Sequence, residues 1–117
     1  MKLINLIRRL EQQPQDNIIH FDFCQAVPCS LSSSRGSYDD LAIGFEFIGS
    51  MEVSELLAIC KGALGTTYPG YKGGEFLMGE FTEVWVDNFG YWTNTKITGI
   101  HDQNFGYSII TTMNIEV

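Results

Sequence analysis

Residues 39–64 read DDLAIGFEFIGSMEVSELLAICKGAL, and within this stretch the spacing of apolar residues changes from every second position to every third or fourth. The first part predicts a half-buried strand over residues 39–49, because apolar and smaller or polar residues alternate there. The alternating apolar residues are Leu41, Ile43, Phe45 and Phe47. The second part predicts an amphipathic helix over residues 52–64, with an apolar face of Val53, Leu56, Leu57, Cys60 and Leu64. Gly65 follows, where a glycine commonly ends a helix.

Toward the N-terminus, the sequence predicts one more helix and one more strand. Helical spacing of Leu3, Leu6, Ile7 and Leu10 indicates a short amphipathic helix over residues 2–12, and Pro14 ends it. Residues 17–24 alternate again and favour a half-buried strand. Residues 25–37 contain Pro28, four serines between residues 30 and 34, and Gly36, which is typical of a loop.

Toward the C-terminus, a glycine-rich connection leads to three expected strands in residues 83–90, 94–100 and 106–115. The order of elements is then αββαβββ. Connections this short do not accommodate repeated crossovers between parallel strands. We therefore expect one α+β domain over residues 1–117, built on a twisted antiparallel sheet of about five strands with two short helices.

The charge of the chain restricts its partners. Seven basic and 14 acidic residues give a formal net charge of −7, which repels nucleic-acid backbones and argues against duplex nucleic acid as a partner. A small anionic ligand remains compatible, because the charge at a pocket can differ in sign from the whole. The cysteines are Cys24, Cys29 and Cys60, and they form no CxxC pair, as expected for reduced thiols in a cytoplasmic protein. No stretch has the length of a membrane span, so no membrane partner is expected.

The sequence holds no recognisable reaction centre. Nucleophilic catalysis needs a base near a serine or cysteine, and neither His20 nor His101 lies in a motif of that kind. His101 is expected in the turn between the last two strands, and His20 on the outer face of a strand. We therefore expect a protein that is not an enzyme and has neither a cofactor nor a metal ion.

Residues 66–94 contain the best candidates for ligand binding, because glycines, aromatic rings and one lysine gather there. The glycines at 70, 73 and 74 would let backbone N–H groups approach anionic oxygens, and Lys72 would add a positive charge. Arg35, isolated in the serine-rich loop, has a guanidinium suited to phosphate. Aromatic residues in the turn after residue 86 would stack on a nucleobase. The alternative for the glycine-rich loop and for the serine-rich loop is that each is a solvated connection without a ligand.

On the segments RGSYDDLAIGFEF, SELLAICKGALGTTYPGYKGGEFLMGEFTEVWVDNFG and NTKITGI, the chain resembles the Thoeris anti-defence proteins of phages and prophages, which are described as sponges. The resemblance covers most of the chain, up to about Ile100. It implies a non-enzymatic, homo-oligomeric protein in the host cytoplasm. Such a protein binds cyclic ADP-ribose isomers, or in some members cyclic oligonucleotides, at subunit boundaries. The ligand-binding residues expected from the resemblance and the residue types together are Arg35, Tyr71, Lys72, Asn88, Phe89, Trp92 and Asn94.

Within this set, the resemblance implies an aromatic residue with an asparagine, which falls on Phe89 with Asn88 or Asn94, and a basic phosphate contact at Arg35 or Lys72. The chain departs from the family in its last expected strand, where no arginine or lysine is present to contact phosphate. A second hypothesis is an acidic inhibitor that binds a host nuclease or DNA-binding enzyme in place of nucleic acid. The scatter of acidic residues from Glu11 to Glu116 favours the sponge.

Overall fold

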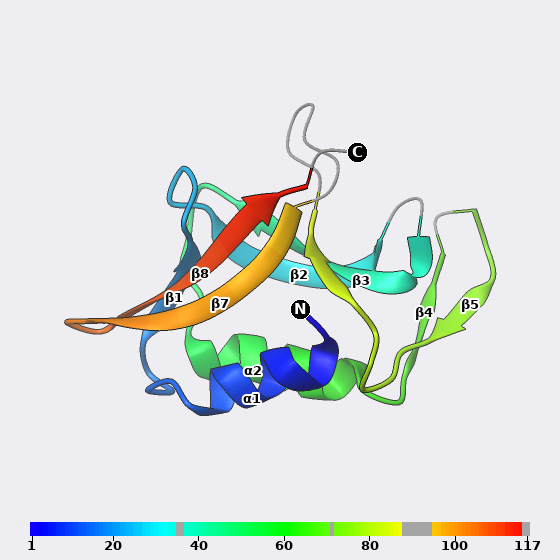
Figure 1. The fold of residues 1–117 in the computed structure, drawn as a ribbon, viewed down its shortest axis with the longest axis horizontal. Coiled ribbons are helices and arrows are strands. Elements are labelled where there is room, and N and C mark those ends of the chain that lie inside the picture. The colour runs from blue at the N-terminus through cyan, green and yellow to red at the C-terminus, as the bar shows by residue number, and fades with distance from the viewer. Residues whose placement is uncertain (35–36, 71, 88–94, 116–117) are drawn as a thin grey trace.

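The structure is a computed structural model that describes residues 1–34, 37–70, 72–87 and 95–115. Figure 1 shows two helices lying against one side of a strongly curved sheet, with a separate small hairpin at one end. The helices are α1 (Leu3–Glu11) and α2 (Val53–Ala63). The strands are β1 (Ile18–Phe21), β2 (Val27–Ser34), β3 (Ser37–Glu46), β4 (Thr67–Pro69), β5 (Glu75–Leu77), β6 (Val84–Val86), β7 (Thr95–Asn104) and β8 (Tyr107–Asn114).

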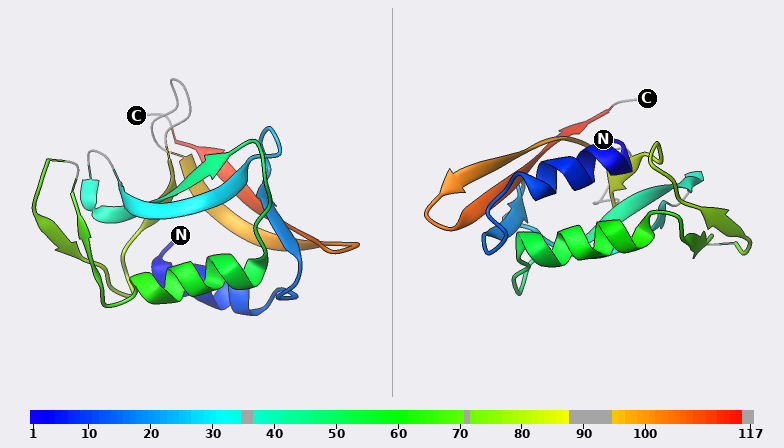
Figure 2. Two further views of the ribbon diagram at one scale, coloured as in Figure 1. Left: turned by 180° about the vertical axis from the view of Figure 1, so that it is seen from behind. Right: turned by 90° about the horizontal axis from the view of Figure 1, so that it is seen from below.

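The main sheet has six strands in the order β1-β8-β7-β6-β3-β2, and β4 and β5 form a two-stranded sheet of their own. The main sheet curves until its two edge strands approach each other, as the view from behind in Figure 2 shows. The turn of residues 22–26 joins the edges, and the Phe21 N–H donates a hydrogen bond of 2.8 Å to the Ala26 carbonyl. The sheet is therefore nearly closed, with a seam where β1 meets β2.

The core lies between the concave side of the sheet and the two helices, which run side by side. Helix α1 buries the four apolar residues predicted from its spacing, Leu3, Leu6, Ile7 and Leu10. Helix α2 buries Val53, Leu56, Leu57, Cys60 and Ala63. Gly65 has a φ of +78° just after the end of α2, which confirms its predicted role in ending the helix. None of the helices among the described residues has the length and apolar character needed to cross a membrane.

The broad α+β class is confirmed, but the predicted order αββαβββ and the count of about five strands are wrong. Residues 25–37 were expected to form a loop, and most of them form β2. Serine and proline are tolerated there because β2 is an edge strand, where a missing N–H breaks no ladder. The glycine-rich connection likewise holds the β4–β5 hairpin. Short polar strands of this kind carry almost no apolar alternation, so the pattern did not indicate them.

The expected purely antiparallel sheet is also wrong, since β1 pairs with β8 and β3 pairs with β6 in parallel. Parallel neighbours need long connections. Here β1 and β8 stand near opposite ends of the chain, and helix α2 with the hairpin lies between β3 and β6. A connection of several elements thus replaces the single crossover helix of a repeated βαβ unit.

Phe47, Leu64 and His101 lie in environments other than those predicted from the sequence. Strand β3 ends at Glu46, so Phe47 leaves the predicted buried face and is 56% exposed. Leu64 caps α2 and is 37% exposed, because the helix ends at Ala63. His101 lies within β7, opposite Ile109, because the turn to β8 comes only at residues 105–106.

Candidate ligand-binding sites

Of the seven predicted ligand-binding residues, only Lys72 lies in the part of the chain that the structure describes. Its side chain is exposed in the turn between β4 and β5. The six others lie outside the described residues: Arg35, Tyr71, Asn88, Phe89, Trp92 and Asn94. Their described neighbours along the chain nevertheless show which parts of the predicted site approach each other.

The neighbours of Arg35 lie beside the hairpin that carries Lys72. The Ser33 hydroxyl donates a hydrogen bond of 2.7 Å to the Pro69 carbonyl, which joins β2 to β4. The rings of Tyr38 and Phe76 lie 5.7 Å apart between centroids, which joins the start of β3 to β5. We call this region the hairpin end: the β4–β5 hairpin with residues 33–34 and 37–38.

The backbone of the hairpin turn is less available to a ligand than the glycines suggested. The Gly70 N–H donates to the Gly74 carbonyl at 3.0 Å, and the Gly73 N–H donates to the Gly70 carbonyl at 3.1 Å. Two of the three glycine amides expected to face an anion therefore already have partners inside the turn. This leaves the Lys72 ammonium as the described positive group of the turn.

The second half of the predicted site, residues 88–94, is flanked by Asp87 and Thr95. The Asp87 N–H donates to the Ile43 carbonyl at 2.9 Å, which places this flank well along β3. Ser37, the described neighbour of Arg35 in β3, lies at the start of the same strand. At about 3.3 Å per residue, Ser37 and Ile43 are about 20 Å apart along β3.

Other candidate residues have structural partners. Trp85 is half-buried and donates a hydrogen bond of 3.0 Å from Nε1 to the Asp40 carboxylate. The Asp40 carboxylate also accepts a hydrogen bond of 3.1 Å from the Ser37 hydroxyl. Burial raises the pKa of the Cys60 thiol to about 12, which keeps it protonated. Among the described residues, no three His, Cys, Asp or Glu side chains come together as a metal site.

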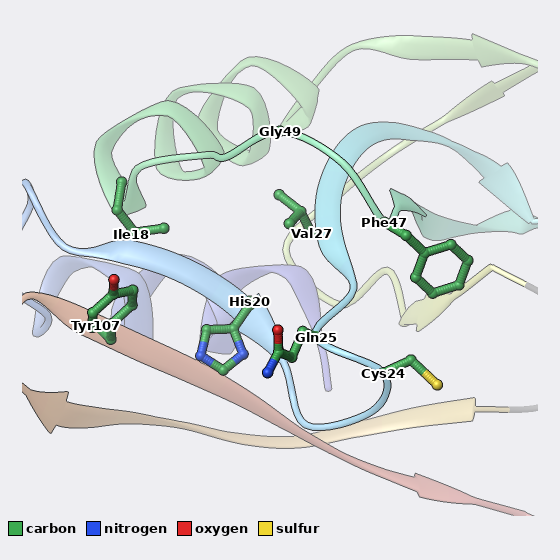
Figure 3. A pocket seen from close by; sticks show the side chains of 8 residues that line it. All are labelled: Ile18, His20, Cys24, Gln25, Val27, Phe47, Gly49 and Tyr107. Atoms are coloured by element: carbon green, nitrogen blue, oxygen red, sulfur yellow. The ribbon is translucent and has the colours of Figure 1, made fainter.

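A cleft of about 560 Å³ opens at the seam of the sheet, and sequence reasoning missed it. We call it the seam cleft. Strand β1 contributes Ile18 and His20, and β2 contributes Val27. Gln25 comes from the turn of residues 22–26, which we call the seam turn. The aromatic side chains of Phe47 and Tyr107 also line the cleft. Figure 3 shows His20 and Gln25 between Tyr107 on one side and Phe47 on the other. The only related signal in the sequence is the apolar alternation of residues 17–24, which places His20 on the outer face of its strand.

Local geometry orients the side chains of the seam cleft. Ile19 and Phe21 face the core, so His20 between them faces outward into the cleft. The His20 Nδ1 lies 2.8 Å from the Phe21 carbonyl. Because a carbonyl only accepts, Nδ1 must carry the proton, which leaves Nε2 as an acceptor in the neutral ring. The ring of Tyr107 meets that of His20 edge-on, with centroids 6.4 Å apart.

The seam turn itself holds two consecutive non-glycine residues in the left-handed region, Cys24 with a φ of 50° and Gln25 with a φ of 51°. Such conformations are uncommon outside glycine and are often retained at functional surfaces. The turn is held by the Ala26 N–H, which donates to the Phe23 carbonyl at 2.9 Å. This conformation places the Gln25 side chain at the cleft.

Comparisons of the chain with protein-family models, with curated proteins and with solved structures found no match.

Proposed function

We propose that the protein binds a small nucleotide messenger and sequesters it without chemical conversion, as the resemblance to anti-defence sponges implies. Cyclic ADP-ribose isomers are the ligands we favour, and cyclic oligonucleotides come second. The proposal assigns phosphate contact to Arg35 and Lys72, and base stacking to Phe89 and Trp92.

The observation that supports the proposal is the contact between the strand ends on either side of Arg35 and the hairpin that carries Lys72. Ser34 and Ser37 flank Arg35, and the strands they belong to contact the Lys72 hairpin through Ser33 and Tyr38. Two positive side chains on neighbouring loops suit a ligand with two phosphates, and each charge-assisted hydrogen bond contributes about 1.5–3 kcal/mol.

The separation of about 20 Å between the flanks of the cation and of the aromatics favours a ligand site shared between subunits. We therefore propose a dimer or higher homo-oligomer. Leu77, the last residue of β5, and Phe81, which follows the hairpin, are 69% and 72% exposed, and large apolar groups left so exposed can contact a partner. Light scattering at micromolar concentration measures the assembly, and a monomer of 13.2 kDa would contradict it.

Thermal-shift screening with ADP-ribose, its cyclic isomers and cyclic dinucleotides tests the function. A ligand at 100 times its dissociation constant stabilises by about 2.7 kcal/mol. Heating the complex and recovering unchanged ligand distinguishes sequestration from turnover. Failure of every nucleotide to shift the melting temperature would overturn the proposal.

Calorimetric titration of variants then tests the assigned residues. Lys72→Ala and Arg35→Ala should each weaken binding by about ten- to a hundredfold, and Arg35→Lys should recover only part of the loss. Lys61→Ala is the matched control, because it also removes one positive charge, but from α2 and not from the hairpin end. The Lys61 Nζ lies 3.4 Å from the Glu11 Oε2. Equal affinity in the Lys72, Arg35 and Lys61 alanine variants would mean that phosphate is held elsewhere.

A further inference from the structure

We propose that the seam cleft is a second binding site, which takes a planar aromatic ligand bearing an ammonium group. This site is separate from the hairpin end and does not depend on the proposed nucleotide function. Its size supports a small-molecule occupant, because about 560 Å³ falls within the range of about 300–1,000 Å³ found for ligand pockets.

The walls of the cleft offer aromatic surface that the fold has not covered. Tyr107 is 50% exposed and Phe47 is 56% exposed, although both are large rings next to a cavity. Rings of this kind bind planar ligands by offset or edge-on contact and attract cations to their faces. The edge-on contact of Tyr107 with His20 holds one of the two rings beside the cleft.

The charge around the cleft selects against anions. No lysine or arginine among the described residues lines it. Glu46 pairs in the sheet with the lining residue Val27. The Glu46 Oε1 lies 3.3 Å from the point where a Cβ atom would stand on Gly49, another lining residue. On the other side, the backbone of Glu52 forms an isolated β-bridge with the lining residue Ile18. The described cations sit on other elements, with Lys2, Arg8, Arg9 and Lys61 in or beside the helices, Lys72 in the hairpin and Lys96 in β7. A positive ligand group is therefore attracted, and a phosphate is repelled.

The polar groups of the cleft complement a hydrogen-bond donor. His20 donates from Nδ1 to the Phe21 carbonyl, so its Nε2 is the acceptor that remains for a ligand. Within the described residues no hydrogen bond to this Nε2 is found. The Gln25 amide adds a second acceptor from the strained seam turn. An ammonium N–H is a donor that matches both.

Three indoles of nearly the same shape test this assignment: tryptamine, 3-ethylindole and indole-3-propionate carry positive, zero and negative charge. Titration followed by calorimetry or ligand-observed NMR should give the tightest saturable binding for tryptamine. The anion should bind at least about tenfold more weakly, with the neutral compound between them. Equal binding of all three, or tightest binding of the anion, would overturn the charge argument.

Variants locate the binding. Tyr107→Ala should weaken tryptamine binding by about tenfold, and Tyr107→Phe should retain most of it because the ring remains. Phe105→Ala is the matched control, since Phe105 is 96% exposed at the neighbouring turn and does not line the cleft. Unchanged tryptamine affinity in Tyr107→Ala, with a cooperative melt in all three variants, would overturn the site.

Three further outcomes distinguish the seam cleft as a small-molecule site from a subunit contact and from the proposed nucleotide site. If Phe47→Ser converts an oligomer into a monomer, a second copy covers the cleft and the small-molecule site is wrong. If tryptamine binds while every nucleotide fails, the seam cleft stands and the proposed function falls. Nucleotide affinity unchanged in Tyr107→Ala would establish that the two sites are independent.

Discussion

The hairpin end and the seam cleft lie at opposite ends of β2, and of the two only the hairpin end carries a described lysine or arginine. At the hairpin end, Lys72 provides positive charge and the Tyr38 and Phe76 rings contact each other. At the seam cleft, Tyr107 is 50% exposed and Phe47 is 56% exposed, and none of the described lysines and arginines lines the cleft. A chain with a net charge of −7 thus separates its positive groups from one of its open aromatic surfaces. Ligand charge, more than ligand shape, should decide which end is occupied.

Phe21→Ala should have the largest effect, because it tests whether one strand serves both the core and the cleft. Phe21 is 1% exposed in the core, and truncation of a buried phenylalanine costs about 3–5 kcal/mol through lost contacts and a cavity. His20→Ala, its neighbour on the cleft face, should cost less than about 1 kcal/mol. Urea unfolding of both variants measures the difference.

A loss of similar size in the two variants would show that the cleft wall is part of the folding core. In that case, mutations in the seam cleft could not be interpreted as binding effects alone. The expected large difference instead permits His20 and Tyr107 to be altered in a folded protein.

The helices and their buried faces were predictable, because their signal is local. Four apolar residues at helical spacing decide α1, whichever strands lie above it. The identity of β2 depends on its pairing with β3, since residues such as Ser30 and Ser32 carry no strand pattern by themselves. The same holds for the parallel pairing of β1 with β8, which joins segments from opposite ends of the chain.

The two candidate sites differ in predictability for the same reason. Lys72 stands in a glycine-rich segment that is conspicuous by composition. The seam cleft combines β1, the seam turn, the residues after β3 and the start of β8, and no one of these segments contains a motif. The left-handed conformation of Cys24 and Gln25 is likewise imposed by the joining of two sheet edges, which composition does not reveal.

The packing beneath the hairpin end should make stability fall at high pH. Burial raises the pKa of Cys60 from 9.0 to about 12 in the folded protein. Between these values the unfolded chain loses the proton and the folded chain keeps it, so stability falls by about 1.4 kcal/mol per pH unit. Below about pH 9 the thiol is protonated in both states, so stability no longer changes with pH through this group. Burial also raises the pKa of Tyr68 in β4, with a smaller contribution from Cys60.

Urea unfolding at pH 8, 9, 10 and 11, for the natural chain and for Cys60→Ala, measures this effect. The variant should show the flatter pH dependence above pH 9, by about 1.4 kcal/mol per unit. Cys24 and Cys29 are exposed and present in both proteins, so they do not contribute to the difference. Parallel curves would mean that the thiol ionises in the folded protein and that the α2 side of the hairpin end is open to water.

A smaller effect than that of Phe21→Ala is expected at Gly70, where the hairpin meets β3. A Cβ atom there would lie 2.7 Å from the Phe76 ring and 2.9 Å from the Gly73 carbonyl oxygen. Because one of these neighbours is backbone, Gly70→Ala should cost about 1–3 kcal/mol and shift the Tyr38–Phe76 ring pair. Thermal melting measures the loss, and the near-ultraviolet circular dichroism of the rings reports the shift.

Gly62→Ala in α2 is the control with the opposite sign. Nothing lies within 4 Å of its Cβ position, and alanine is favoured over glycine in a helix by about 0.5–1 kcal/mol, so this variant should be more stable. The Gly62 carbonyl, which accepts the Thr66 hydroxyl at 2.8 Å, is unchanged by the substitution. A stabilising Gly62→Ala together with a neutral Gly70→Ala would mean that the hairpin moves freely against β3. The two cation-bearing loops would then have no fixed relation, and a phosphate site built from both would lose its structural support.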